Sequence, residues 1–83
     1  MIIQAEISLY PLHEPDLAPP IYGFVRHLER SGLRVEVGAM SSMVSGESEL
    51  VFSALREAYE AACAAGTRVL VVKFINSGAR APA

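Results

Sequence analysis

Hydrophobic and polar residues alternate along residues 2–10, a pattern typical of a strand with one face in the core and the other in water. Shorter runs over residues 33–38 and 40–44 predict two further strands, joined by a hairpin near Gly38. Residues 68–75 predict a fourth strand. The chain therefore carries four strand signals, one at each end and two close together in the middle.

Apolar residues at intervals of three and four predict two helices, over about residues 20–31 and 49–65. We expect residues 46–48 to break the third strand and the Ser48 hydroxyl to cap the second helix. Gly32 is expected to end the first helix with a positive φ. The residues predicted to form the apolar stripes are Ile21, Phe24, Val25 and Leu28 in the first helix, and Val51, Phe52, Leu55, Ala58, Tyr59 and Ala62 in the second.

The order of these elements predicts an α+β fold, the ferredoxin-like βαββαβ sandwich, with a four-stranded antiparallel sheet and two helices on one face. A chain of 83 residues forms one domain, which we assign to residues 1–76, with residues 77–83 as a flexible C-terminal tail. The first and last strands are antiparallel neighbours in this topology. Glu6 and Lys73 are therefore expected to form a cross-strand ion pair on the open face.

The last strand is apolar on both faces. A strand with one face exposed to solvent should instead alternate between apolar and polar residues. Its two apolar sets are Leu70, Val72 and Phe74 on one side and Val69, Val71 and Ile75 on the other, interrupted by Lys73. So short a chain has no further helix to cover the second face. We therefore expect another copy of the chain to cover it, which indicates an oligomeric binding protein, a homodimer or a dimer-of-dimers tetramer.

Charge and composition exclude several classes of function. Nine acidic and seven basic residues give a net charge of −2, which argues against nucleic acid and against an anionic membrane surface. The single cysteine, Cys63, cannot form an internal disulfide, and its alanine neighbours predict a small buried helix residue. The chain begins with strand-like residues and contains no apolar stretch of membrane-spanning length, so we expect a cytoplasmic protein.

The sequence contains no pattern that predicts catalysis. It has no glycine-rich phosphate loop, and neither Cys-x-x-Cys nor His-Glu-x-x-His is present, so no metal or cofactor is expected. His13, Glu14 and Asp16 lie close together, but their proline-rich segment favours a solvated loop. His27 is expected at the surface of the first helix. Because no nucleophile has a base nearby, we expect a protein that is not an enzyme.

Four serines, Ser41, Ser42, Ser45 and Ser48, gather around the third strand. Two interpretations remain open for them. They can serve turn and capping chemistry, or their hydroxyls can line a pocket for a small molecule.

Three segments together carry a resemblance to a known family: residues 7–12, 31–47 and 69–75. With these segments in this order, the chain resembles the YkoF-like thiamine-binding proteins, once catalogued as having no known function. The resemblance implies a ferredoxin-like fold, association through the sheets into dimers and tetramers, and binding of thiamine or its hydroxymethylpyrimidine part without chemical change. Ser41 and Ser42 stand where that family has glycine and threonine, and Asn76 stands where it has an acidic residue.

An aminopyrimidine needs hydroxyl or amide partners and an apolar surface beneath its ring. We expect these partners at the sheet edge where two subunits meet, with Glu47 or Glu6 for the thiazolium charge. The alternative is a structural or regulatory protein-interaction module without a ligand, in which Tyr10 packs in an interface and Glu47 is solvated. The predicted ligand-binding residues are Ser8, Tyr10, Ser41, Ser42, Glu47 and Asn76.

Overall fold

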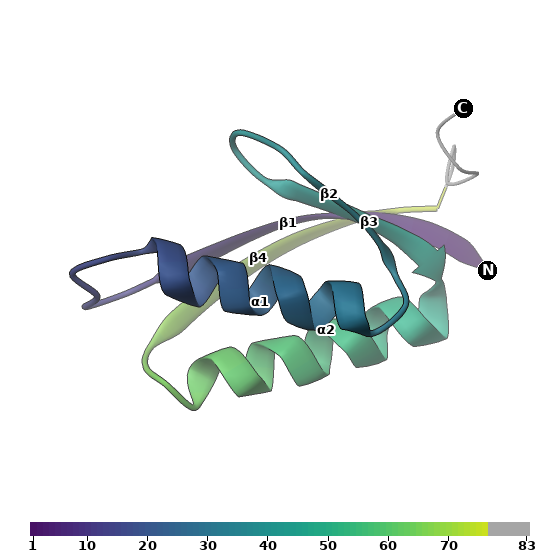
Figure 1. Ribbon diagram of the computed structural model, residues 1–83. Coiled ribbons are helices and arrows are strands. Elements are labelled where there is room, and N and C mark those ends of the chain that lie inside the picture. Colours follow the sequence, from purple (N-terminus) through teal and green to yellow (C-terminus); the bar gives the residue numbers. More distant parts are fainter. Residues whose placement is uncertain (77–83) are drawn as a thin grey trace.

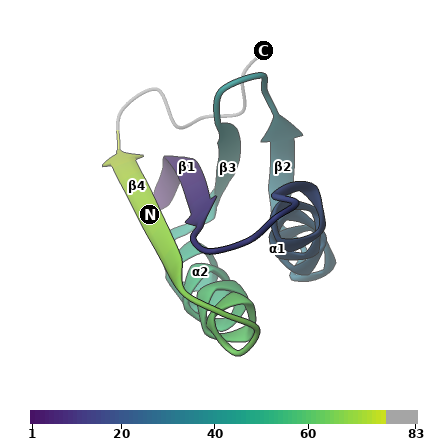
Figure 2. The same cartoon turned by 90° about the vertical axis from the view of Figure 1, so that its left-hand side faces the viewer.

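The computed structural model describes residues 1–76, and it confirms the βαββαβ order and the ferredoxin-like sandwich (Figure 1). The four strands form one antiparallel sheet in the order β2-β3-β1-β4. Both helices lie on the same side of this sheet (Figures 1 and 2). The predicted tail, residues 77–83, lies outside the described residues. The elements are β1 (Ile2–Pro11), α1 (Ala18–Arg30), β2 (Arg34–Val37), β3 (Ser42–Glu47), α2 (Ser48–Cys63) and β4 (Arg68–Ile75).

The core lies between the sheet and the two helices, as the alternation along β1 predicts. Ile3, Ala5 and Ile7 point from β1 toward the helices and are buried. Gly32 has φ +92°, so it provides the predicted left-handed residue after α1. The other members of the buried core are Phe24, Leu28, Leu33, Val44, Val51, Ala54, Leu55 and Ala58.

The boundary between β3 and α2 differs from the prediction. β3 continues through Gly46, which pairs with Ile3, and α2 begins directly at Ser48. A Cβ atom at Gly46 would lie 2.9 Å from Leu33 Cδ2, so a side chain at this strand position would require the buried Leu33 side chain to shift. The predicted Ser48 cap was wrong, because the cap position is Glu47 and no side chain there bonds the helix.

Two predictions of burial on α2 were also wrong. Phe52 is 55% exposed, because it lies at the edge of the sheet and stacks on Phe74 of β4, with ring centroids 4.6 Å apart. Cys63 is exposed, because it lies in the last turn of the helix, beyond the buried positions that end at Ala58. Val51, Ala54, Leu55 and Ala58 instead form the buried stripe of α2.

The face of the sheet opposite the helices carries no other element of residues 1–76 (Figure 2). Its central ion pair is the predicted one, since Glu6 pairs with Lys73 in register and Oε1 lies 3.7 Å from Nζ. Val71 and Ile75 of β4 are 45% and 50% exposed on this face. We call it the open face; across the strands it presents Ile2, Gln4, Glu6, Ser8 and Tyr10, then Val69, Val71, Lys73 and Ile75, then Arg34, Glu36, Met43, Ser45 and Glu47.

Candidate functional site

Four of the six predicted ligand-binding residues meet at one end of the sheet. Ser8 and Tyr10 lie near the end of β1, while Ser41 and Ser42 lie where the 38–41 turn enters β3. All four line one hollow of about 170 Å³ between this turn, β1 and α1. We call it the hairpin hollow; its other lining residues are Ile7, Leu9, Ile21, Phe24, Val25, Val37, Gly38, Ala39 and Met40.

The hydroxyls reach the hairpin hollow from both sides of the sheet. Ser42 pairs with Ile7 and therefore faces the helix side, whereas Ser8 pairs with Val71 and faces the open side. The Ser41 hydroxyl donates to Glu6 Oε2 at 3.1 Å. Glu6 therefore contacts one of these serines, and it was one of the two carboxylates expected for a cationic ligand.

Glu47 and Asn76 lie away from this hollow. Glu47 pairs with Ile2, five positions along β1 from Ile7 and Ser42, which is about 17 Å at a rise of about 3.3 Å per residue. Its carboxylate accepts from the N-terminal amine of Met1 at 2.8 Å. Asn76 follows Ile75, which pairs with Gln4 near the same end. The sheet register thus divides the predicted residues into two groups.

A second and larger cavity, of about 590 Å³, lies between α1, α2 and the loop before α1. We call it the interhelix cavity. Its floor and walls are mostly apolar, and its charged residues come from three separate segments of the chain. The lining residues are Glu14, Pro15, Asp16, Pro19, Pro20, Gly23, Phe24, His27, Arg30, Ala58, Ala61, Ala62, Ala65 and Arg68.

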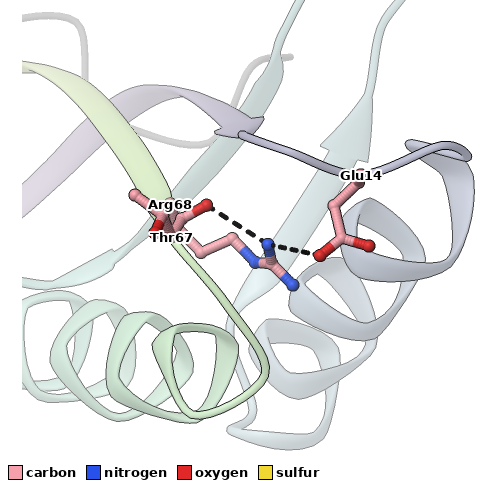
Figure 3. Close-up of polar contacts among 3 residues, drawn as sticks. All are labelled: Glu14, Thr67 and Arg68. Carbon is pink, nitrogen blue, oxygen red and sulfur yellow. Dashed lines mark hydrogen bonds and ion pairs between the residues drawn. The ribbon is translucent and has the colours of Figure 1, made fainter.

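Arg68 is the buried charged residue of this cavity (Figure 3). Its side chain is 2% exposed, and Nη1 donates to Glu14 Oε2 at 3.0 Å and to the Thr67 carbonyl at 3.2 Å. Nε is enclosed and has no hydrogen-bond partner among residues 1–76. The pairing of Arg68 with Glu14 was not predicted, because 54 residues separate them and Glu14 lies in an irregular loop between β1 and α1.

Glu14 thus serves this ion pair rather than a metal site. In residues 1–76 no group of three or more His, Cys, Asp and Glu side chains is arranged to hold a metal ion. His13 adopts a φ of +59°, and the Asp16 carboxylate accepts from the Ala18 backbone N–H at 3.1 Å. No helix in the same range is long and apolar enough to cross a membrane.

The sequence matches the model of the YKOF-related family over residues 2–79. Several solved structures share the fold. A hypothetical protein from Methanocaldococcus jannaschii has 21% identity and a TM-score of 0.83, with 90% of this chain and 79% of that chain covered. A Streptococcus pneumoniae protein has 20% identity and a TM-score of 0.86, with 93% and 88% covered.

A third structure carries a functional name. It is a Thermotoga maritima protein provisionally named a thiamine biosynthesis/salvage protein, with 20% identity and a TM-score of 0.84. The alignment covers 93% of this chain and 85% of that chain. No functionally curated protein matches the sequence.

Proposed function

The chain belongs to the YKOF-related family, and from this premise we propose that it is an oligomeric small-molecule-binding protein. Its ligand is thiamine or the hydroxymethylpyrimidine part of thiamine, which it binds without chemical change. The name of the Thermotoga maritima protein supports this ligand class. The observation that carries the proposal is the grouping of four hydroxyl-bearing residues in one hollow next to an uncovered sheet face, on which β4 exposes Val69, Val71 and Ile75.

The chemistry of the hairpin hollow suits an aminopyrimidine ring. Serine hydroxyls both donate and accept, so Ser8 and Ser42 can meet the ring nitrogens and the exocyclic amine. Tyr10 adds an aromatic surface of which half is exposed. Glu6, held by Ser41 and Lys73, supplies a negative charge for the cationic thiazolium ring.

The size of the hollow links ligand binding to association. At about 170 Å³ it is smaller than the roughly 300–1,000 Å³ of typical small-molecule sites. It therefore holds one ring and leaves the rest of the ligand to be covered from outside. A second copy placed on the open face would cover it, because Ser8 and Tyr10 lie both on that face and in the hollow.

Isothermal titration calorimetry with thiamine and with hydroxymethylpyrimidine tests the proposal. We expect measurable binding of both, and a two- to tenfold loss in Ser8→Ala and in Ser42→Ala, the effect of one hydrogen bond. Ser53→Ala is the matched control, since Ser53 is exposed on α2 and donates to the Leu50 carbonyl. Absence of heat at millimolar ligand, or equal losses in all three variants, would contradict it.

A protein-interaction module without a ligand is the second candidate function. The open face favours this second function, because Val69, Val71 and Ile75 are exposed there and do not line the hairpin hollow. A partner protein could therefore bind this face without any ligand in the hollow. A chain that assembles through this face and gives no heat with either compound would have this function instead.

A further inference from the structure

We propose that the interhelix cavity is a second ligand site, which binds a small molecule with an apolar body and a carboxylate head, the head on Arg68. This site goes beyond the proposed function and lies apart from the hairpin hollow, with Phe24 as a shared lining residue. The hollow takes its hydroxyls from β1, the 38–41 turn and the first residue of β3, whereas the cavity lies between the two helices.

Small side chains on both helices form the space for the body of the ligand. Gly23 of α1, three alanines of α2 and Ala65 just beyond that helix line the cavity. Phe24, Pro15 of the loop and the two prolines at the start of α1 form its apolar walls. Its volume of about 590 Å³ lies within the usual range for small-molecule sites. A mostly apolar cavity with a few convergent polar groups is the usual form of such a site.

The unused donors of Arg68 indicate what the head must be. A guanidinium carries five N–H donors, and the two contacts of Arg68 both involve Nη1. Neither Nε nor Nη2 donates to another group among residues 1–76, and Nε is enclosed. An enclosed donor without an acceptor costs about 1–3 kcal/mol. The edge formed by Nε and Nη2 is the one that binds a carboxylate with two parallel hydrogen bonds.

The backbone next to the guanidinium leaves room for the ion pair of Arg68 with Glu14. A Cβ atom at Gly66 would lie 2.7 Å from Arg68 Nη1 and 3.1 Å from Glu14 Oε2, so Gly66 leaves the space that this ion pair occupies. The two hydrogen bonds of Nη1 hold the guanidinium in place before a ligand arrives, and a preorganised group loses less entropy on binding.

The charges around the cavity permit a monoanion. Arg68 and Arg30 balance Glu14 and Asp16, so the lining has no net charge when His27 is neutral. One oxygen of Glu14 accepts from Nη1 of the guanidinium. The edge formed by Nε and Nη2 remains for the ligand.

Benzoate is a suitable probe, with benzamide as its neutral analogue of the same shape. In ¹H–¹⁵N correlation spectra we expect benzoate to shift the amides of residues 14–24 and 58–68, and benzamide to bind at least tenfold more weakly. Arg68→Met should abolish the benzoate shifts. Arg56→Met is the matched control, because Arg56 is exposed on α2, pairs with Glu60 at 3.3 Å and does not line the cavity.

A second variant keeps the test decisive if Arg68→Met fails to fold. Ala61 is exposed and lines the cavity, so Ala61→Phe should fill it without disturbing the core and should weaken benzoate binding at least tenfold. Equal binding of benzoate and benzamide, or full benzoate binding by Ala61→Phe, would overturn the proposal. Thiamine titrations of the same variants distinguish the two sites, because Ala61→Phe should weaken benzoate binding and leave thiamine binding unchanged.

Discussion

The two carboxylate oxygens of Glu6 have different partners on the open face. One oxygen accepts from the Ser41 hydroxyl and the other faces the Lys73 ammonium, while Gln4, Ser8 and Met43 lie beside Glu6 on the open face. In the single chain Lys73 is largely exposed and Glu6 is partly exposed, so the ion pair contributes less than about 1 kcal/mol to folding. If a second copy covers the face, the same pair loses its water and each charge then depends on the other.

Removal of Lys73 should therefore affect assembly far more than folding. We expect Lys73→Ala to change the free energy of unfolding by less than about 1 kcal/mol. Association should weaken by about 2 kcal/mol or more, because Glu6 would be buried without its partner. The exchanged pair Glu6→Lys with Lys73→Glu should assemble like the original chain.

Urea unfolding and sedimentation equilibrium measure these two quantities. Arg56→Ala is the control, since it breaks an exposed ion pair that lies on α2 rather than on the open face. Unaltered association of Lys73→Ala, or loss of association in the exchanged pair, would show that this ion pair is not covered by a partner.

Single residues were predictable where their surroundings follow from strand alternation. The ion pair of Glu6 and Lys73 is such a case, because strand order and register determine it. Arg68 and Cys63 were not predictable in the same way. The partner of Arg68 lies in an irregular loop, and the exposure of Cys63 depends on where the sheet stops covering α2.

At the scale of elements, the sequence predicted the type of all six and misplaced the junction of β3 and α2. A glycine before an acidic residue and a serine is usually a turn, so the strand was expected to stop early. In the structure Gly46 is a strand residue because Leu33 and Val51 fill the space next to it. Tertiary packing, which local sequence does not contain, decides this junction.

The close approach of Leu33 to Gly46 predicts that a methyl group at this position destabilises the fold. Gly46→Ala should destabilise the chain by about 1–3 kcal/mol, because Leu33 must move within a packed core. Gly23→Ala is the matched control: a Cβ atom there meets no atom of the described residues within 4 Å. Because Gly23 lies in the interior of α1, Gly23→Ala should stabilise the folded chain by about 0.5–1 kcal/mol.

Urea denaturation of both variants measures the difference. A neutral or stabilising effect of Gly46→Ala would mean that β3 can shift away from the helices, and that packing around Leu33 does not set the end of the strand.

At the scale of the whole molecule, the sheet has one face covered by helices and one face that residues 1–76 leave open. The βαββαβ order predicted this asymmetry, and the structure places the apolar residues Val69, Val71 and Ile75 of β4 on the open side. The sequence could not predict the interhelix cavity. That cavity arises where small residues of two helices meet an irregular loop, and none of the three segments signals it alone.

The central claim, that a second copy covers the open face, is tested most directly by sedimentation equilibrium of the full chain at micromolar concentration. We predict a dimer or tetramer, and a folded monomer for Val71→Lys, which places a charge in the middle of the apolar strand. Tyr22→Lys, at an exposed apolar position on α1, should assemble normally. A well-folded monomer of the unaltered chain at that concentration would contradict the account.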